Sequence, residues 1–235
     1  MEFVNREKEI MRVLKRLNEE KLDLIVIGGY AVSGLARHRL SVDCDIVVPK
    51  NELPKLEEIL SKEGFKERVR RTGFDQTYGG EFISYKKDVS ELPVTIDLLV
   101  DSLVCKATSA SWRFDYIKKH STEATVTGTE ASANCRIPEK ELLIAFKIHS
   151  ARKTDIRDII MLRENADWET VLKHTKKGKK EALREQIQKI TKALEDPNLV
   201  DSLKGVFALT TDVKKQIDNT RKDMKTIYSK LHESS

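Results

Sequence analysis

The fold of this chain is decided by the stretch Ile27-Gly28-Gly29-Tyr30-Ala31-Val32-Ser33-Gly34 together with Asp43-Cys44-Asp45-Ile46-Val47-Val48. The apolar residues 24–27 predict a short buried strand, and the glycine pair after them predicts a tight turn leading into a short helix over 30–36. Asp43 and Asp45 open a second apolar strand. Because side chains alternate along a strand, both carboxylates point the same way and Cys44 points the opposite way.

This pattern indicates a phosphate-binding turn beside a metal-binding pair of carboxylates. Gly28 and Gly29 lack Cβ atoms, so backbone N–H groups can approach an anion there, and the start of the following helix adds partial positive charge. Two neighbouring carboxylates repel each other unless a cation lies between them, and Mg2+ suits that position. The alternative is an ordinary strand-turn-helix unit with two solvated aspartates, but Asp-x-Asp entering an apolar strand is costly without a ligand.

Residues 22–100 resemble the signature of the nucleotidyltransferase superfamily that includes DNA polymerase β: an apolar strand, Gly-Gly or Gly-Ser, a short helix, then Asp-x-Asp. With Gly34, Arg37 and Ser41, the stretch looks most like the minimal nucleotidyltransferases. Among these it is most similar to the abortive-infection type IV toxin group and to relatives that modify antibiotics. The resemblance implies an α/β (α+β) nucleotidyltransferase fold, with a small mixed sheet flanked by helices. One departure is Gly29, where many members have Ser.

The family has a third carboxylate on a later strand, and the run Val94-Thr95-Ile96-Asp97-Leu98-Leu99-Val100 supplies Asp97 as the candidate. Alternation places Thr95, Asp97 and Leu99 on one face of this strand. Asp97 is an isolated carboxylate within an apolar run, so the alternative is a strand-end aspartate that reaches solvent. We expect Asp97 to complete a cluster with Asp43 and Asp45.

The resemblance implies an enzyme that transfers a nucleoside monophosphate from an NTP such as ATP to an acceptor hydroxyl, releasing pyrophosphate. Three carboxylates suit a displacement at phosphorus with two Mg2+ ions, which stabilise the attacking and leaving oxygens. Asp43 and Asp45 would hold the ions. Asp97 would share the catalytic ion and take the proton from the acceptor hydroxyl.

The phosphates of the NTP require cationic or N–H groups around the turn. Gly28 and Gly29 would supply backbone N–H groups, and Ser33 would donate a hydrogen bond to a phosphate oxygen, unless it only caps the helix. Arg37 and Arg39, just before the Asp-x-Asp pair, would neutralise phosphate charge; the alternative is that both are solvated.

A second resemblance to the abortive-infection group lies at 142–158: a Lys on one helix, then Lys/Arg-x-Asp-hydrophobic-x-Asp on the next. It implies that Lys147 contacts nucleotide phosphates and that Asp155 or Asp158 is also needed. The alternative is a surface lysine with a cluster of salt bridges.

The distribution of charge along the chain indicates which kind of molecule accepts the nucleotide. Residues 1–135 carry 21 Lys and Arg against 22 Asp and Glu, a net charge of −1; residues 136–235 carry 22 against 16, a net charge of +6. The basic second half favours RNA, with tRNA ends as a candidate, and the lysines of 173–180 are a natural place for phosphate contacts. The alternatives are an aminoglycoside-like small molecule, a protein side chain, or a non-catalytic binding or antitoxin-like module. The toxin-group resemblance adds a cognate antitoxin as a possible partner.

Bulk properties predict a cytoplasmic protein without membrane attachment. No apolar run approaches the roughly 20 residues that span a bilayer, and the N-terminus lacks the layout of a secretory signal. The three cysteines are odd in number and widely spaced, which argues against a disulfide framework and against a zinc site.

Apolar spacing and turn residues divide the chain into a catalytic domain, 1–136, and a helical domain, 137–235. Residues 101–136 contain short apolar pieces among many Ser and Thr, which predicts one or two strands and loops whose positions this pattern does not give. Asn51 is expected to cap a helix that ends at Gly64, and Thr154 or Asp155 to cap a later one. The expected helices are 5–20, 30–36, 51–63, 138–149, 154–162, 168–175, 179–194 and 210–231, and the expected strands are 24–27, 44–48, 65–69, a strand-loop-strand section over 72–90, and 94–100.

Overall fold

The computed structural model describes residues 2–41, 43–73, 75, 77, 79–89 and 92–233. The chain forms two compact units, one of residues Met1–Val104 and Ser111–Glu139, the other of Cys105–Ala110 and Lys140–Ser235. Within the described residues, no helix has both the length and the apolar character that a membrane crossing needs.

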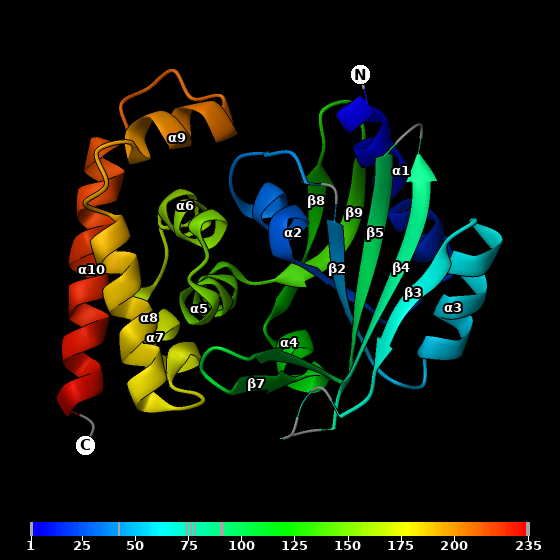
Figure 1. The fold of residues 1–235 in the computed structure, drawn as a ribbon, viewed down its shortest axis with the longest axis horizontal. Coiled ribbons are helices and arrows are strands. Elements are labelled where there is room, and N and C mark those ends of the chain that lie inside the picture. Colours follow the sequence, from blue (N-terminus) through cyan, green and yellow to red (C-terminus); the bar gives the residue numbers. More distant parts are fainter. Residues whose placement is uncertain are drawn as a thin grey trace. The chain divides into compact units, whose positions relative to one another are not determined.

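The first unit is built on a mixed five-stranded sheet with the strand order β1-β2-β5-β4-β3. Its strands are β1 (Ile25–Ile27), β2 (Asp43–Val48), β3 (Lys66–Arg71), β4 (Glu81–Val89) and β5 (Leu92–Val100). Figure 1 labels β2 to β5. Only β2 and β5 run parallel; the other neighbouring pairs are antiparallel. The apolar runs seen in the sequence form two of the three inner strands, β2 and β5, and the predicted small mixed sheet is confirmed.

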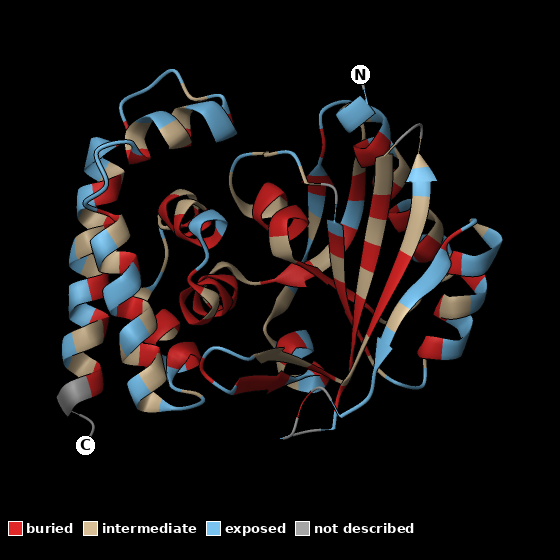
Figure 2. Ribbon diagram, viewed as in Figure 1, coloured by how far each residue is buried: buried red, intermediate tan, exposed pale blue. Residues whose placement is uncertain are grey.

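Helices α1 (Glu2–Glu19) and α3 (Leu53–Lys62) cover one face of this sheet. The Lys87 ammonium on β4 donates to Glu9 of α1 and to the carbonyl of Glu63 after α3, both at 2.7 Å. Since side chains alternate, Ser84, three residues earlier on the same strand, faces the other side of the sheet. The buried positions, red in Figure 2, include most of the central strands. The face without α1 and α3 is the one that carries the candidate site.

Residues 101–136, unassigned from the sequence, contain two hairpins and a short helix. They form β6 (Ser102–Cys105), β7 (Ala110–Arg113), α4 (Phe114–Lys119), β8 (Ser121–Thr127) and β9, which extends to Pro138 from Ser132. The hairpin of β8 and β9 packs against α2 (Gly28–Leu35), beside which it is drawn in Figure 1. A Cβ at Gly34 would lie 2.9 Å from the Ile137 side chain, so this glycine lets α2 lie close to the hairpin.

The second unit consists mainly of helices. These are α5 (Lys140–Ser150), α6 (Lys153–Leu162), α7 (Trp168–Thr175), α8 (Lys180–Ala193), α9 (Leu199–Phe207) and α10 (Lys214–Glu233). Helix α5 is buried along Leu142–His149, on all sides rather than on one stripe, which is typical of a central helix. Helix α9 was not predicted from the sequence, although its buried residues Leu199, Leu203 and Phe207 recur at helical spacing after the turn at Pro197.

Two predicted helix caps were wrong. The residue before α3 is Glu52, without a side-chain cap, rather than Asn51. The residue before α6 is Arg152, and Asp155 lies one turn inside the helix, where its carboxylate accepts the Arg152 backbone N–H at 3.1 Å. In the predicted strand-loop-strand section over 72–90, the second strand is β4, while Phe74, Gln76, Tyr78 and Ser90 lie outside the described residues.

Candidate active site

The glycine turn lies directly against one of the predicted metal ligands. Gly28 follows β1 with a φ of +67°, a conformation that residues with a Cβ rarely adopt. A Cβ at this position would be 2.3 Å from Oδ2 of Asp45. Glycine is therefore needed here twice, for the backbone angle and for the space that the carboxylate occupies.

The three predicted carboxylates lie on the adjoining strands β2 and β5. In the parallel register of these strands, Asp45 is paired with Asp97 and Asp43 with Thr95. The Thr95 hydroxyl donates to Oδ1 of Asp43 at 2.6 Å, which orients this exposed carboxylate. Asp43, Thr95 and Asp97 line one cleft: the predicted alternation along β5 places Thr95 on the face of Asp97, and the register of β2 with β5 brings Asp43 to them.

Asp97 is the carboxylate whose surroundings most clearly fit a bound cation. Its Oδ1 is buried and has no hydrogen-bond partner among the described residues. Burial raises the pKa of Asp97; a hydrogen bond from Ser84 acts in the opposite direction. A buried acceptor without a donor is unfavourable unless a cation or proton completes it. Carboxylate oxygens from two strands fit a hard divalent cation such as Mg2+.

Of the predicted phosphate ligands near the turn, Arg39 is better placed than Arg37. A Cβ on Gly29 would lie 3.1 Å from a guanidinium nitrogen of Arg39. Arg37 is exposed. Ser33 is buried, and its hydroxyl donates to the carbonyl of Gly29 at 3.3 Å, within the helix. The phosphate contacts of Ser33 and Arg37 stay predictions.

Lys147 is buried in the second unit rather than on its surface. Its ammonium, on α5, contacts Asp155 and Asp158 of α6, each at 2.9 Å, and its side chain is 5% exposed. Burial acts to lower the pKa of Lys147, but the charges of Asp158 and Asp155 outweigh it, so that the pKa is raised. Burial acts to raise the pKa of Asp155, and Lys147 and Arg152 bring it below its ordinary value. The role of Lys147 at nucleotide phosphates stays a prediction.

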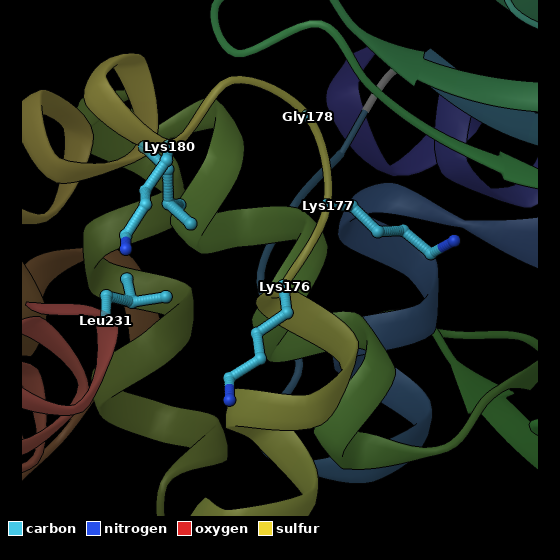
Figure 3. A pocket seen from close by; sticks show the side chains of 6 residues that line it. Lys176, Lys177, Gly178, Lys180 and Leu231 are labelled. Carbon is cyan, nitrogen blue, oxygen red and sulfur yellow. The ribbon is translucent and has the colours of Figure 1, made fainter. Parts of the chain in front are cut away.

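The lysine-rich stretch 173–180 forms a basic pocket between α7 and α8. Figure 3 shows its labelled residues: the side chains of Lys176 and Lys180 extend away from that of Lys177. The pocket has a volume of about 220 Å³. It is lined by Lys176, Lys177, Gly178, Lys180, Leu183 and Leu231. Burial lowers the pKa of Lys177.

Gly178 fixes the backbone of this pocket. Its φ is +70°, and a Cβ on it would lie 2.3 Å from the carbonyl oxygen of Thr108. The next N–H, that of Lys179, donates to the same carbonyl at 2.7 Å. The lysines are thus presented by a loop that is anchored to another segment of the second unit.

Four polar residues of the carboxylate cleft were not among the predicted site residues. Arg68 and Arg71 of β3, Ser84 of β4 and Thr95 of β5 line the cleft with the aspartates. The alternation along β5 already placed Thr95 beside Asp97. The other three depend on how β3 and β4 pair, which local sequence patterns do not give.

Comparison with known proteins gives the following similarities. JHP933 from Helicobacter pylori has 18% identity and a TM-score of 0.49, with 99% of this chain and 94% of that chain covered. The lincosamide antibiotic adenylyltransferase LnuA, lincomycin-bound, has 20% identity and a TM-score of 0.47, covering 68% of this chain and 98% of that one. ANT(2″)-Ia in complex with adenylyl-2″-tobramycin has 16% identity and a TM-score of 0.49, with 75% of this chain and 95% of that chain covered.

No curated protein matches the sequence. Since the identities and TM-scores of these structures are low, the assignment comes from a family model that matches residues 6–195. The matched range includes the glycine turn, the three carboxylates and the lysines of the basic pocket. The chain belongs to the family described as uncharacterised nucleotidyltransferases.

Proposed function

We propose that this nucleotidyltransferase moves a nucleoside monophosphate from an NTP to an acceptor hydroxyl on RNA, with tRNA ends as the leading candidate. The proposal is carried by one observation: Asp43, Asp45 and Asp97 occupy adjoining positions on β2 and β5, and Oδ1 of Asp97 is buried without a donor among the described residues. This donor set would hold two Mg2+ ions. When bound, the ions would neutralise charge that develops on the attacking and leaving oxygens.

The chain's own residues would divide the remaining work. Backbone N–H groups after Gly28 would approach the β- and γ-phosphates, and the guanidinium of Arg39 above Gly29 would neutralise their charge. A carboxylate oxygen of Asp97 would receive the proton of the acceptor hydroxyl. Ser33, Arg37 and Lys147 stay proposed phosphate ligands.

The RNA acceptor is supported by the electrostatics of the second unit. Its helices carry the excess of positive charge, and the α7–α8 loop presents Lys176, Lys177 and Lys180 around one pocket. Lysines on an anchored loop suit the phosphates of a polyanion. We therefore assign catalysis to residues 1–136, and contacts with the body of the acceptor RNA to the helical residues 137–235. A relation to the abortive-infection toxins, with a cognate antitoxin, is part of the same proposal.

The first test is Mg2+-dependent transfer from α-labelled NTPs to total RNA. We expect label in RNA with the wild-type protein, and at least a 100-fold loss with Asp43→Ala/Asp45→Ala or with EDTA. Asp88→Ala is the matched control, because Asp88 is an exposed acid of β4 that pairs with Lys86 outside the cleft.

Each other outcome contradicts a separate part of the proposal. Transfer to a small hydroxylated molecule or to a protein, with none to RNA, would contradict the acceptor. Absence of both transfer and Mg2+-dependent NTP binding would contradict the enzyme and leave a non-catalytic module. Equal loss in Asp88→Ala would mean that the double variant reports misfolding.

A further inference from the structure

The carboxylate cleft has a second, basic side that the proposed chemistry does not use. On β3, Arg68 and Arg71 line the same cleft as Asp43 and Asp97. The cleft has a volume of about 270 Å³. This is just below the roughly 300–1,000 Å³ that is typical of ligand pockets, so the cleft suits one part of a substrate.

Arg68 reaches this cleft through a β-bulge. The antiparallel pairing of β3 with β4 is regular up to Glu67, which is opposite Tyr85, and resumes with Val69 opposite Ser84. Arg68 is therefore the extra residue. In a regular strand, consecutive side chains point to opposite faces, yet Arg68 and Val69 both line the cleft. Bulges re-aim side chains in this way and are over-represented next to active sites.

The neighbouring Arg70 shows the contrast. It faces away from the cleft, where its guanidinium pairs with Glu57 of α3 and with Glu67 at 2.7 Å. Arg68 and Arg71 are exposed, and neither forms an ion pair with any residue that the structure describes. The charge of Arg68 acts on Asp97, whose pKa it lowers, against the larger effect of burial. Two guanidinium groups thus lie at the edge of the cleft and form no ion pair with the residues that the structure describes.

The pairing of the strands places these arginines opposite the glycine turn. One row of paired residues crosses the sheet and consists of Val69, Ser84, Asp97, Asp45 and Ile27. Arg68 precedes Val69 at one end of this row, and Gly28 follows Ile27 at the other end. At about 4.8 Å per strand, its ends are roughly 19 Å apart, with the carboxylates between them.

This arrangement separates two phosphate-binding regions. In a displacement at phosphorus, the attacking and leaving oxygens lie roughly in line on opposite sides of the phosphorus atom. If the glycine turn binds the leaving pyrophosphate, the acceptor approaches from the side of β3. An acceptor that meets two unpaired guanidinium groups is favoured if it is anionic, whereas a polyamine such as an aminoglycoside is repelled.

We propose that Arg68 and Arg71 bind the phosphodiester next to the reacting hydroxyl of an RNA 3′ end. The inference rests on the proposed function, because the reaction defines which side receives the acceptor. Guanidinium groups bind phosphate through paired N–H donors, a geometry that lysine does not reproduce. The arginine pair therefore both binds the acceptor and selects an anionic acceptor over a cationic one.

The test uses a fluorescent RNA trinucleotide whose terminal sugar is 2′,3′-dideoxy, so that it has no terminal hydroxyl to react. Its binding is measured by fluorescence anisotropy at several salt concentrations. We expect Arg68→Ala/Arg71→Ala to weaken trinucleotide binding at least 10-fold. The slope of the logarithm of the binding constant against the logarithm of the salt concentration should become less steep by about 0.7, the contribution of one neutralised phosphate on a single strand. Mg2+-NTP binding should stay within twofold of wild type. Arg68→Lys/Arg71→Lys should recover part of the affinity. Arg70→Ala, the matched control, should change neither affinity.

A second readout uses a trinucleotide whose terminal phosphodiester is replaced by an uncharged methylphosphonate. Wild type should bind it more weakly than the charged form, and Arg68→Ala/Arg71→Ala should bind the two alike. Unchanged trinucleotide affinity in this variant overturns the inference. So does a loss of NTP affinity instead, since the phosphate would then be that of the nucleotide. Because trinucleotide binding needs no turnover, a failure of the arginine pair is distinguishable from a failure of the transfer reaction.

Discussion

At the scale of single residues, Gly28 controls the position of a proposed metal-binding carboxylate. Gly28→Ala would place a methyl group where Oδ2 of Asp45 lies, and its φ of +67° would add about 1 kcal/mol of strain. A displacement of about 1 Å costs on the order of 100-fold in rate, so we expect at least that loss in transfer, with a small change in Tm. Activity and thermal unfolding measured on the same sample separate the two effects.

Gly178 tests whether the backbone of the basic pocket is anchored, with Gly205 as the control. Gly178→Ala would collide with the carbonyl of Thr108 at a φ of +70°, so we expect about 2–3 kcal/mol of destabilisation in urea unfolding. Gly205 is the control: it lies in the exposed part of α9 with open space around it, and Gly205→Ala should stabilise by about 0.5–1 kcal/mol. Equal effects in the two variants would contradict the anchored loop.

At the scale of elements, Lys147 joins α5 to α6. Removing one partner of a buried ion pair leaves an uncompensated charge, so Lys147→Met should cost about 3–5 kcal/mol, because Asp155 and Asp158 stay buried. The measurement is urea unfolding at pH 7. If Lys147 acted only on nucleotide phosphates, the variant would keep its stability and lose NTP affinity. Lys153→Met, at an exposed position on α6, is the control.

The same elements show how far sequence patterns reach. Alternation along β2 was sufficient to predict that Asp43 and Asp45 share a face, because that periodicity is local. The position of Asp97 beside Asp45 depends in addition on the parallel register of β2 with β5. The partner of each strand is not local: the pairing of Ser84 with Asp97 and the bulge at Arg68 arise from pairing between separate strands. The elements of residues 101–136 could not be placed for a related reason, since β8 and β9 pair with each other and pack against α1, α2 and β1, contacts that the local sequence does not give.

At the scale of the whole molecule, the two units can be followed separately. The chain has two tryptophans: Trp112, fully buried in the first unit, and Trp168, at the start of α7 in the second. The variant Trp168→Phe keeps only Trp112, so its fluorescence reports the unfolding of the first unit. The variant Trp112→Phe keeps only Trp168 and reports the unfolding of the second unit. This allows a stability change to be assigned to the unit in which its cause lies.

Acid should destabilise the second unit through His149. The ring is buried, its Nδ1 is 2.7 Å from the Thr108 hydroxyl, and its Nε2 is 3.0 Å from the carbonyl of Thr175. Nε2 must carry the hydrogen, because a carbonyl only accepts, so Nδ1 accepts from Thr108 in the neutral ring. Burial, with a smaller effect from Lys177, lowers the pKa of His149 to about 4.

The sign follows from the two protonation states. Between pH 6.5, the ordinary pKa of histidine, and pH 4 the unfolded chain binds a proton that the folded chain does not. The stabilisation is therefore complete above pH 6.5 and is lost as pH falls, by about 2 kcal/mol between pH 7 and pH 4.5. In urea titrations at these two pH values, the Trp168 reporter should show this loss, and His149→Gln should reduce it to a few tenths. A loss of the same size at Trp112 alone, or no change after His149→Gln, would assign the acid sensitivity to another group and contradict the neutral, buried histidine.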